Sequence, residues 1–402
     1  MKTTRPLLAA LAALLLASAP AIAGCAFENK VPVKVSAAAF PAWKAVTSAM
    51  AECGNVQSEL SQEFQDKQAA GFAARPSLYH IGGVANSSLV QLVNQGLVHP
   101  LDDLVARFGQ KLRPNQLIRV DGKIVAIAMM ANAQHLMYRK DIFDALGIAV
   151  PETYEDLLAA ADRIQKANPV KYPFGGTWKT TWLEFVNVYM GYVGEFFTDR
   201  VQPAINNPKG IAALEMLRKL TAYMDPEYLV SDATYVQQQF QQGRIAMANY
   251  WASRAAALDD PKELQVVGKV AMAAAPAPEK GLLPASTLWW DGIVIARNIS
   301  YAEAEAALKV TLEGMDTDMV KASNSVAIGL IEGYAADKLA TGAQATAAKG
   351  AKPYPASTQM GLMQKAIANK LNDILKGSKD ARTTLADIEA DYRVQAKEAG
   401  LL

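Results

Sequence analysis

Tryptophan and amide side chains are the residues of this 402-residue chain with the most distinctive chemistry. The chain has six tryptophans, and several lie beside polar residues, as in Gly175–Trp182 and Ala248–Arg254. An indole can bury the flat C–H face of a ring compound, while Asn, Gln, Asp and Arg side chains hydrogen-bond to hydroxyls around its rim. Residues of these types in one cleft would hold a polyhydroxylated small molecule without breaking any bond.

Signatures of enzymes and of metal sites are weak in this sequence. The three histidines, His80, His99 and His135, do not have metal-ligand spacing. No G-x-S-x-G, P-loop or H-E-x-x-H motif occurs, and no pair of carboxylates can be placed at the separation that glycosidases use. We therefore expect no catalytic residue, no metal and no cofactor, and keep a secreted glycan hydrolase only as an alternative.

Charge and composition exclude other classes of protein. The 40 Lys and Arg residues balance 39 Asp and Glu residues, so no basic face is expected to bind nucleic acid. A hydrophobic content of 51% with 20% charged residues is typical of a well-packed globule, and the length favours two lobes over one core. The Ala-, Gly- and Thr-rich run Leu339–Gly350 is expected to be a helix end and a surface loop.

The first 23 residues have the pattern of a secretion signal. Lys2 and Arg5 supply positive charge, Leu7–Ala17 is a short apolar stretch, and Ala21-Ile22-Ala23 forms a cleavage site. The apolar stretch is shorter than the roughly 20 residues that a membrane span needs, so a membrane anchor is the less favoured alternative. We expect a signal peptide over residues 1–23 and export to the periplasm.

The two cysteines, Cys25 and Cys53, allow two interpretations. Ile22-Ala23-Gly24-Cys25 fits a lipoprotein box, which would make Cys25 a lipid-modified N-terminus. Alternatively, Cys25 precedes the first strand and Cys53 ends the following helix, and a helix that returns to the start of its strand brings the two sulfurs together. A strand beginning so soon after Cys25 leaves no flexible linker, so we favour the disulfide and keep lipid anchoring as the alternative.

Strand and helix patterns alternate near the N-terminus, in the order of a parallel sheet covered by helices. Loops that follow such strands share one edge of the sheet, where ligands bind, so Trp43 and Asn86 are expected at that edge. The strands are expected at Val31–Val35, Val56–Leu60 and Pro76–Ile81, and the helices at Trp43–Cys53, Phe64–Phe72 and Ser87–Gln95.

The most informative segment of the chain is Asp121–Lys166. Ile124–Met130 is an unbroken apolar run, typical of a strand that is buried on both faces. Ala131–His135 interrupts this run with amide side chains, and Leu136–Tyr138 resumes it. The sequence therefore predicts two strands separated by a polar crossing.

Two helices are predicted after these strands. The first ends at Gly147, and the second, Tyr154–Lys166, follows a capping-box spacing of Thr153 and Asp156. This order of motifs resembles the maltose-binding type of bacterial extracellular solute-binding proteins, although Arg139 stands where the family usually has Asn. The matching residues are Asp121-Gly122-Lys123, Tyr138-Arg139-Lys140-Asp141-Ile142-Phe143, Leu146-Gly147-Ile148 and Pro151–Leu158.

The resemblance implies an α/β, two-lobe periplasmic-binding-protein (type II) fold with a hinge between the lobes. Lobe 1 would hold residues 24–132 and 291–328, and lobe 2 would hold residues 133–290 and 329–402. The chain would then cross between the lobes three times, and Ala131–His135 would lie in the hinge beside the ligand cleft.

The resemblance also implies which side chains meet the ligand. In this family an aromatic residue at the place of Trp251 stacks on the ligand, and the place of Trp43 contributes contacts. Trp289 and Trp290 lie at the second crossing, where alternation along a strand would turn one indole, preferably Trp290, to the cleft. The alternative to ligand binding is burial in the core for each tryptophan and helix capping for Asn86. The expected ligand-binding residues are Trp43, Asn86, Asn132, Gln134, Trp178, Trp251, Arg254, Trp289, Trp290, Asp291 and Tyr354.

The function implied by the resemblance is substrate binding for an ABC importer. The protein, expected to be a monomer, would close around a carbohydrate or polyol and deliver it to the permease subunits. The alternative is the same fold holding a small organic anion or amino compound through Arg254 or Lys179. Binding through charge would weaken with ionic strength, which separates the two hypotheses.

Overall fold

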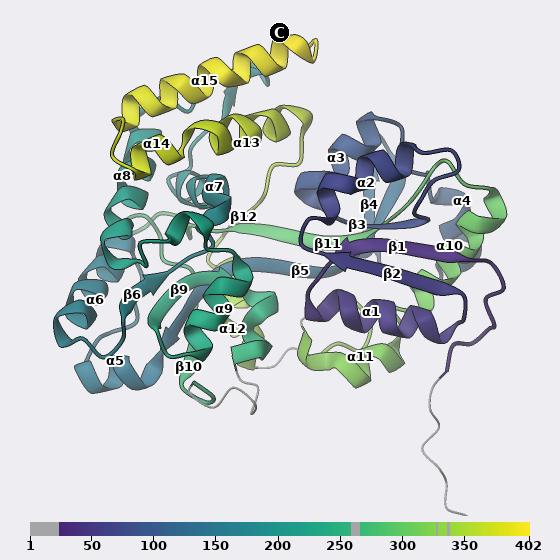
Figure 1. Ribbon diagram of the computed structural model, residues 1–402, viewed down its shortest axis with the longest axis horizontal. Helices are drawn as coiled ribbons and strands as arrows, with labels where there is room; N and C mark the ends of the chain where they lie inside the picture. The colour runs from purple at the N-terminus through teal and green to yellow at the C-terminus, as the bar shows by residue number, and fades with distance from the viewer. Residues whose placement is uncertain (1–23, 259–265, 327–328, 336–337) are drawn as a thin grey trace, which may run out of the picture.

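The computed structural model describes residues 24–258, 266–326, 329–335 and 338–402. Figure 1 shows two groups of helices and strands joined at mid-height by two long strands, β5 (Lys123–Arg139) and β11 (Thr287–Ile295). The group on the right, which contains β1, is called lobe 1, and the group on the left, which contains β9, is called lobe 2. The exact residues at which one lobe passes into the other stay a prediction.

One sheet of ten strands runs through both lobes of the described chain. Its main order is β2-β1-β3-β11-β5-β9-β6, while β4 and β10 pair with β5, and β12 pairs with β11. A separate hairpin joins β7 (Phe197–Thr198) to β8 (Gln202–Pro203). The other strands of the large sheet are β1 (Val33–Ala38), β2 (Val56–Ser61), β3 (Ile81–Ala85), β4 (Leu117–Val120), β6 (Tyr172–Gly175), β9 (Ile245–Trp251), β10 (Val270–Ala273) and β12 (Lys352–Pro353).

The predicted interruption of β5 at Ala131–His135 is wrong, because β5 is one continuous strand. Ala131–Ala133 pair with β11, and Gln134 and His135 pair with β9. The Asn132 amide donates to Ser253 Oγ at 3.1 Å and accepts from the backbone N–H groups of Ala133 and Ser253. Gln134 Nε2 donates to Thr177 Oγ1 at 3.1 Å. The crossing between the lobes is therefore built from paired strands.

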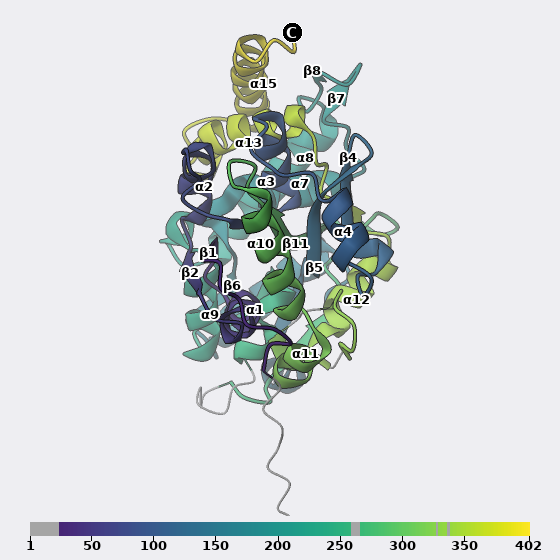
Figure 2. The same ribbon diagram turned by 90° about the vertical axis from the view of Figure 1, so that its right-hand side faces the viewer.

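Lobe 1 has helices on both faces of its part of the sheet (Figures 1 and 2). Val33, Val35, Ile293 and Ile295 of the strands pack with α1, α4, α10 and α11 on one face. Val84 and Val294 pack with α2 and α3 on the other. These helices are α1 (Pro41–Glu52), α2 (Phe64–Ala73), α3 (Asn86–Asn94), α4 (Asp102–Phe108), α10 (Tyr301–Glu313) and α11 (Thr317–Ser323).

The third strand of lobe 1 lies later in the chain than expected. β3 spans Ile81–Ala85, whereas the apolar pattern predicted a strand over Pro76–Ile81. The glycine pair inside β3 hid the apolar pattern that marks a strand. A Cβ atom on Gly83 would lie 2.8 Å from both Ala37 and Trp43. Glycine thus permits close packing at the centre of the sheet.

Lobe 2 contains a larger core and a smaller one on the opposite face of the sheet. The predicted capping box is confirmed, since Asp156 N–H donates to Thr153 Oγ1 at 3.1 Å, and Gly147 ends its helix at a φ of 60°. The helices of lobe 2 are α5 (Lys140–Leu146), α6 (Tyr154–Ala167), α7 (Thr181–Gly191), α8 (Pro208–Leu220), α9 (Ala233–Gln241), α12 (Thr341–Ala348), α13 (Thr358–Lys370), α14 (Asn372–Leu375) and α15 (Ala381–Glu398).

A disulfide joins Cys25 to Cys53, with the Cα atoms 4.9 Å apart. It ties the start of the described chain to the end of α1, which confirms the pairing expected from strand and helix geometry. The predicted signal peptide, residues 1–23, lies outside the described residues. Among the helices that the structure describes, none has both the length and the apolar character required to cross a bilayer.

Candidate binding site between the lobes

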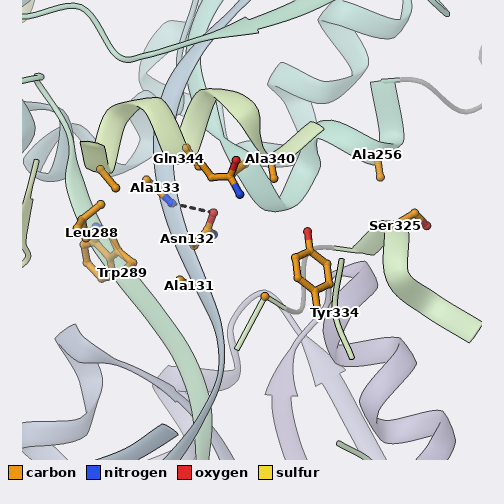
Figure 3. Close-up of a pocket in the computed structure, with 14 residues that line it drawn as sticks. Ala131, Asn132, Ala133, Ala256, Leu288, Trp289, Ser325, Tyr334, Ala340 and Gln344 are labelled. Atoms are coloured by element: carbon orange, nitrogen blue, oxygen red, sulfur yellow. Dashed lines mark hydrogen bonds between the residues drawn. The ribbon is translucent and has the colours of Figure 1, made fainter. Parts of the chain in front are cut away.

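A cavity of about 430 Å³ lies beside the two crossing strands (Figure 3). Ala131–Ala133 of β5 and Leu288 and Trp289 of β11 form one side. Lobe 2 adds residues of α12 and of the 3₁₀ helix η5 (Ala252–Leu258). Tyr334, which packs against the core of lobe 1, closes the cavity from the other lobe. A relative movement of the lobes would therefore change the size of this space.

None of the described residues that line the cavity carries a charge. Seven of them are alanines, and the polar groups are supplied by Asn132, Ser325, Tyr334 and Gln344. Figure 3 shows the Gln344 side chain and the Tyr334 hydroxyl reaching the cavity from different elements. Such a lining suits a neutral molecule with both apolar faces and hydroxyl groups.

Trp289 is the indole of this lining, and three further aromatic side chains surround it. The Tyr354 ring lies 4.5 Å away, between ring centroids. The Trp251 ring lies 5.8 Å away and nearly perpendicular, and the Trp182 ring lies 6.3 Å away. These contacts fix the Trp289 ring from several sides, so its position at the cavity is set before any ligand arrives.

The structure brings five of the expected ligand-binding residues to this region. Asn132 and Trp289 line the cavity, and Trp251 and Tyr354 contact Trp289. Asn86 donates its Nδ2 hydrogen to the carbonyl oxygen of Leu288, a lining residue, at 3.3 Å. The Oδ1 atom of Asn86 is buried and has no hydrogen-bond partner among the described residues.

Other expected residues lie elsewhere. Trp43 is only 1% exposed within the lobe 1 core, and Trp178 is 2% exposed and packs edge-on against Tyr228. Trp290, the slightly preferred one of the two neighbouring indoles, packs against the lobe 1 core beside α2 and α3. Arg254 donates an Nη1 hydrogen to Gln237 Oε1 at 3.4 Å. These four side chains are absent from the described lining of the cavity.

Asp291 follows the two tryptophans of β11 and lies opposite Ala85 and Met130 in the sheet. Its side chain is partly buried, and no hydrogen bond to its carboxylate is found among the described residues. Loss of solvation raises the pKa of Asp291 to about 7. Asp291 is absent from the described lining of the cavity.

Gln134 also points away from the cavity, into a buried polar network. Its Nε2 atom donates to Thr177 Oγ1 at 3.1 Å and to Glu184 Oε1 at 3.0 Å. Thr177 Oγ1 donates to the same Glu184 oxygen at 3.0 Å. Burial raises the pKa of Glu184 to about 7, although these two hydrogen bonds oppose the shift.

The sequence pattern did not indicate that α12 contributes to the cavity. The run Leu339–Gly350 was expected to end a helix and form a surface loop, but α12 (Thr341–Ala348) is a helix that supplies Ala343, Gln344 and Ala347 to the cavity. The small side chains that suggested a loop are the ones that leave room beside β5. The described residues contain no cluster of His, Cys, Asp or Glu side chains able to hold a metal ion.

The sequence of this two-lobe protein matches a known protein family. The family model for bacterial extracellular solute-binding proteins matches residues 55–311, which is more than half of the chain. The chain belongs to this family. Members of this family bind solutes and are not enzymes, so the expectation of a binding protein is confirmed at the level of the family.

The chain is 30% identical over 184 residues to a protein of Deinococcus radiodurans described as a probable ABC transporter-binding protein. The aligned part covers 42% of this chain and 42% of that relative. The match thus spans less than half the length of the relative. It does not by itself assign the activity of the whole relative to this chain.

Solved structures show the same fold over nearly the whole chain. A solute-binding protein of an ABC transporter from Agrobacterium radiobacter K84, in complex with ribitol, superimposes with a TM-score of 0.78 at 21% identity, covering 93% of this chain and 100% of that one. Maltose-bound MalE3 of T. maritima superimposes with a TM-score of 0.79 at 17% identity, covering 90% and 99%. The predicted two-lobe α/β fold is confirmed.

Proposed function

We propose that this solute-binding protein holds a neutral carbohydrate or polyol between its lobes and delivers it to the permease of an ABC importer. The observation that carries the proposal is the cavity beside β5 and β11. Both lobes contribute to its walls, and none of the described residues that line it is charged. Trp289 offers a flat face to a sugar ring, and Asn132, Tyr334 and Gln344 offer hydrogen-bond partners to its hydroxyls. The structures in complex with ribitol and with maltose support this class of ligand.

Opening and closing of the lobes would couple binding to delivery. A ligand that contacts both lobes stabilises the closed form by its difference in affinity for the two forms. The permease would then recognise the closed form, and the protein would act as a monomer.

The periplasm is the compartment that fits this role. The pattern of residues 1–23 predicts export, and a disulfide such as Cys25–Cys53 persists in an oxidising compartment. The sulfur of Cys25 is bonded to Cys53, which leaves no thiol for a lipid anchor in this form of the protein. A soluble periplasmic protein is therefore favoured over an anchored lipoprotein.

Tryptophan fluorescence of the purified protein tests the ligand class. We expect a saturable change with at least one of maltose, ribitol and D-mannitol, and the same dissociation constant at low and high salt. Trp289→Ala should raise that dissociation constant roughly tenfold or more, because it removes the stacking face. Trp178→Phe is the matched control, since Trp178 is buried away from the cavity, and it should keep wild-type affinity.

A response only to organic anions such as citrate or glutamate, weakened by salt, would contradict the proposal and favour the anion alternative. Delivery is tested by uptake of the radiolabelled ligand in cells that lack the gene. Uptake should fall in those cells and return when the gene is restored.

A further inference from the structure

A chain of four hydrogen bonds leads from the cavity to a buried carboxyl group. Trp289 Nε1 donates to Thr287 Oγ1 at 2.7 Å, and Thr287 Oγ1 donates to Asn187 Oδ1 at 2.7 Å. Asn187 Nδ2 donates to Gln134 Oε1 at 2.9 Å, and Gln134 Nε2 donates to Glu184 Oε1 at 3.0 Å. The chain joins both crossing strands, β5 and β11, to α7 of lobe 2.

The chemistry of the two ends sets the direction of every bond. The indole nitrogen of Trp289 can only donate, and the Glu184 oxygen at the far end accepts. Thr287, Asn187 and Gln134 must therefore each accept on the Trp289 side and donate on the Glu184 side. The donor at one end and the acceptor at the other therefore agree on how both amides are turned and which way the Thr287 hydroxyl points.

All five side chains that form this series of hydrogen bonds are buried, so water cannot easily replace a missing hydrogen-bond partner. Hydrogen bonds that run in one direction polarise one another in such an environment, and a broken link leaves a buried polar group unpaired. Loss of the Glu184 acceptor is therefore expected to weaken each hydrogen bond between Glu184 and Trp289.

We infer that Glu184 is a positioning residue of the site: it terminates the chain of hydrogen bonds and thereby holds the Trp289 indole at the cavity. Glu184 itself is absent from the described lining and is expected to touch no ligand. Its effect on ligand affinity rests on the proposed function, whereas its effect on the indole does not.

Indole N–H exchange, measured by NMR on the ligand-free protein, tests the chain. The six tryptophans give six indole N–H signals, and Trp289→Phe identifies one of them by its loss. Thr287→Val breaks the first bond, while Thr287→Ser keeps the hydroxyl as its control. Glu184→Met removes the terminal acceptor, while Glu184→Gln keeps an acceptor oxygen as its control.

We expect the Trp289 N–H to exchange roughly tenfold faster in Thr287→Val and in Glu184→Met than in the wild type. Both controls should stay close to the wild-type rate. Faster exchange in Thr287→Val but not in Glu184→Met would overturn the inference, because the chain would end at Thr287. An equal increase of the Trp289 N–H exchange rate in Glu184→Gln and in Glu184→Met would also overturn the inference.

If Glu184→Met does not fold, a variant that removes another residue of the hydrogen-bond series can be used for the same test. Asn187→Leu removes the middle link while leaving the Thr287 hydroxyl in place, and it should speed exchange of the same signal. An unchanged Trp289 signal in Asn187→Leu would count against the inference.

Affinity for maltose and ribitol separates this inference from the proposed function. If either sugar binds, Glu184→Met should weaken it roughly tenfold and Glu184→Gln about twofold at most. If neither binds while the exchange pattern holds, the proposed ligand class fails and the positioning role of Glu184 stands. If binding occurs but is unchanged in Glu184→Met, the effect on affinity is refuted.

Discussion

Asp291 lies two residues after Trp289 on β11 but outside the described lining of the cavity, so its protonation should respond to a hydroxyl compound that extends beyond that lining. Its pKa is raised to about 7 because burial penalises the charged form of the carboxyl group. A ligand hydroxyl that donates to Asp291 stabilises the ionised form, so binding and loss of the proton favour each other. Affinity should therefore rise as pH rises through about 7.

The expected change is a roughly tenfold lower dissociation constant at pH 8 than at pH 6, measured by fluorescence titration with maltose or ribitol. Asp291→Asn is the control, because it cannot titrate and should bind with little dependence on pH. Since Glu184 also has a pKa near 7, a pH dependence that persists in Asp291→Asn would assign the effect to another group.

Residue patterns located positions along strands better than directions of side chains. Asn132 and Trp289 were predicted because they lie at the crossings, and both line the cavity. Trp43 was predicted from its place after the first strand and Trp178 from its place in a polar loop, but both indoles turn into cores. Which way a side chain points there depends on packing against distant residues, which a local pattern does not contain.

Helix α12 packs so closely on β5 that one glycine is required at their contact. A Cβ atom on Gly342 would lie 2.2 Å from Nδ1 of the buried His135 ring, a distance that forces either the ring or the helix to move. Gly342→Ala should lower the free energy of unfolding by roughly 1–3 kcal/mol, even though alanine favours helix. Chemical denaturation measures this change.

Gly361→Ala in α13 is the matched control for that substitution. The nearest atom to its new Cβ would be Nε2 of Gln91 at 3.7 Å, an ordinary contact, so the variant should be neutral or slightly more stable. Equal stability of the two variants would show that α12 can shift away from β5 without penalty.

Local chemistry predicted some elements well and misjudged others. The capping box before α6 and the glycine after α5 depend only on neighbouring residues, and both are present as expected. The continuity of β5 depends on pairing with β11 and β9, and the helical state of α12 depends on its contact with β5. Such long-range partners decide the state of segments whose own composition is ambiguous.

At the scale of the whole molecule, the disulfide should stabilise lobe 1 more than lobe 2. It closes a loop between positions 28 residues apart and ties the start of the chain to α1. Cys25→Ser with Cys53→Ser should cost about 3–4 kcal/mol of unfolding free energy in lobe 1. Urea unfolding followed by Trp43, which is buried in the lobe 1 core, reports this change.

Reductant provides the control for this prediction. Wild-type protein in reductant should unfold at the same urea concentration as the double serine variant, and reductant should not alter the variant itself. A wild-type midpoint unaffected by reduction would contradict a stabilising role for the disulfide.

The two-lobe plan was predictable because one segment, Asp121–Lys166, carries a family pattern. Matches of the family model and of solved structures confirm that plan. Neither composition nor periodicity indicated where the lobes meet, because β5 and β11 are apolar on both sides of the crossing. The proposed lobe boundaries remain predictions for that reason.

The ends of the described chain belong to different lobes. Cys25 is fastened to α1 in lobe 1, while α15 carries the C-terminus at the far end of lobe 2 (Figure 1). Any swing of one lobe against the other therefore alters the distance between the two ends. Fluorescent proteins fused to the two ends of the processed chain would convert that swing into a change in energy transfer. Such a fusion would report ligand binding optically, and its two attachment points, at the Cys25 end and the α15 end, lie away from the cavity.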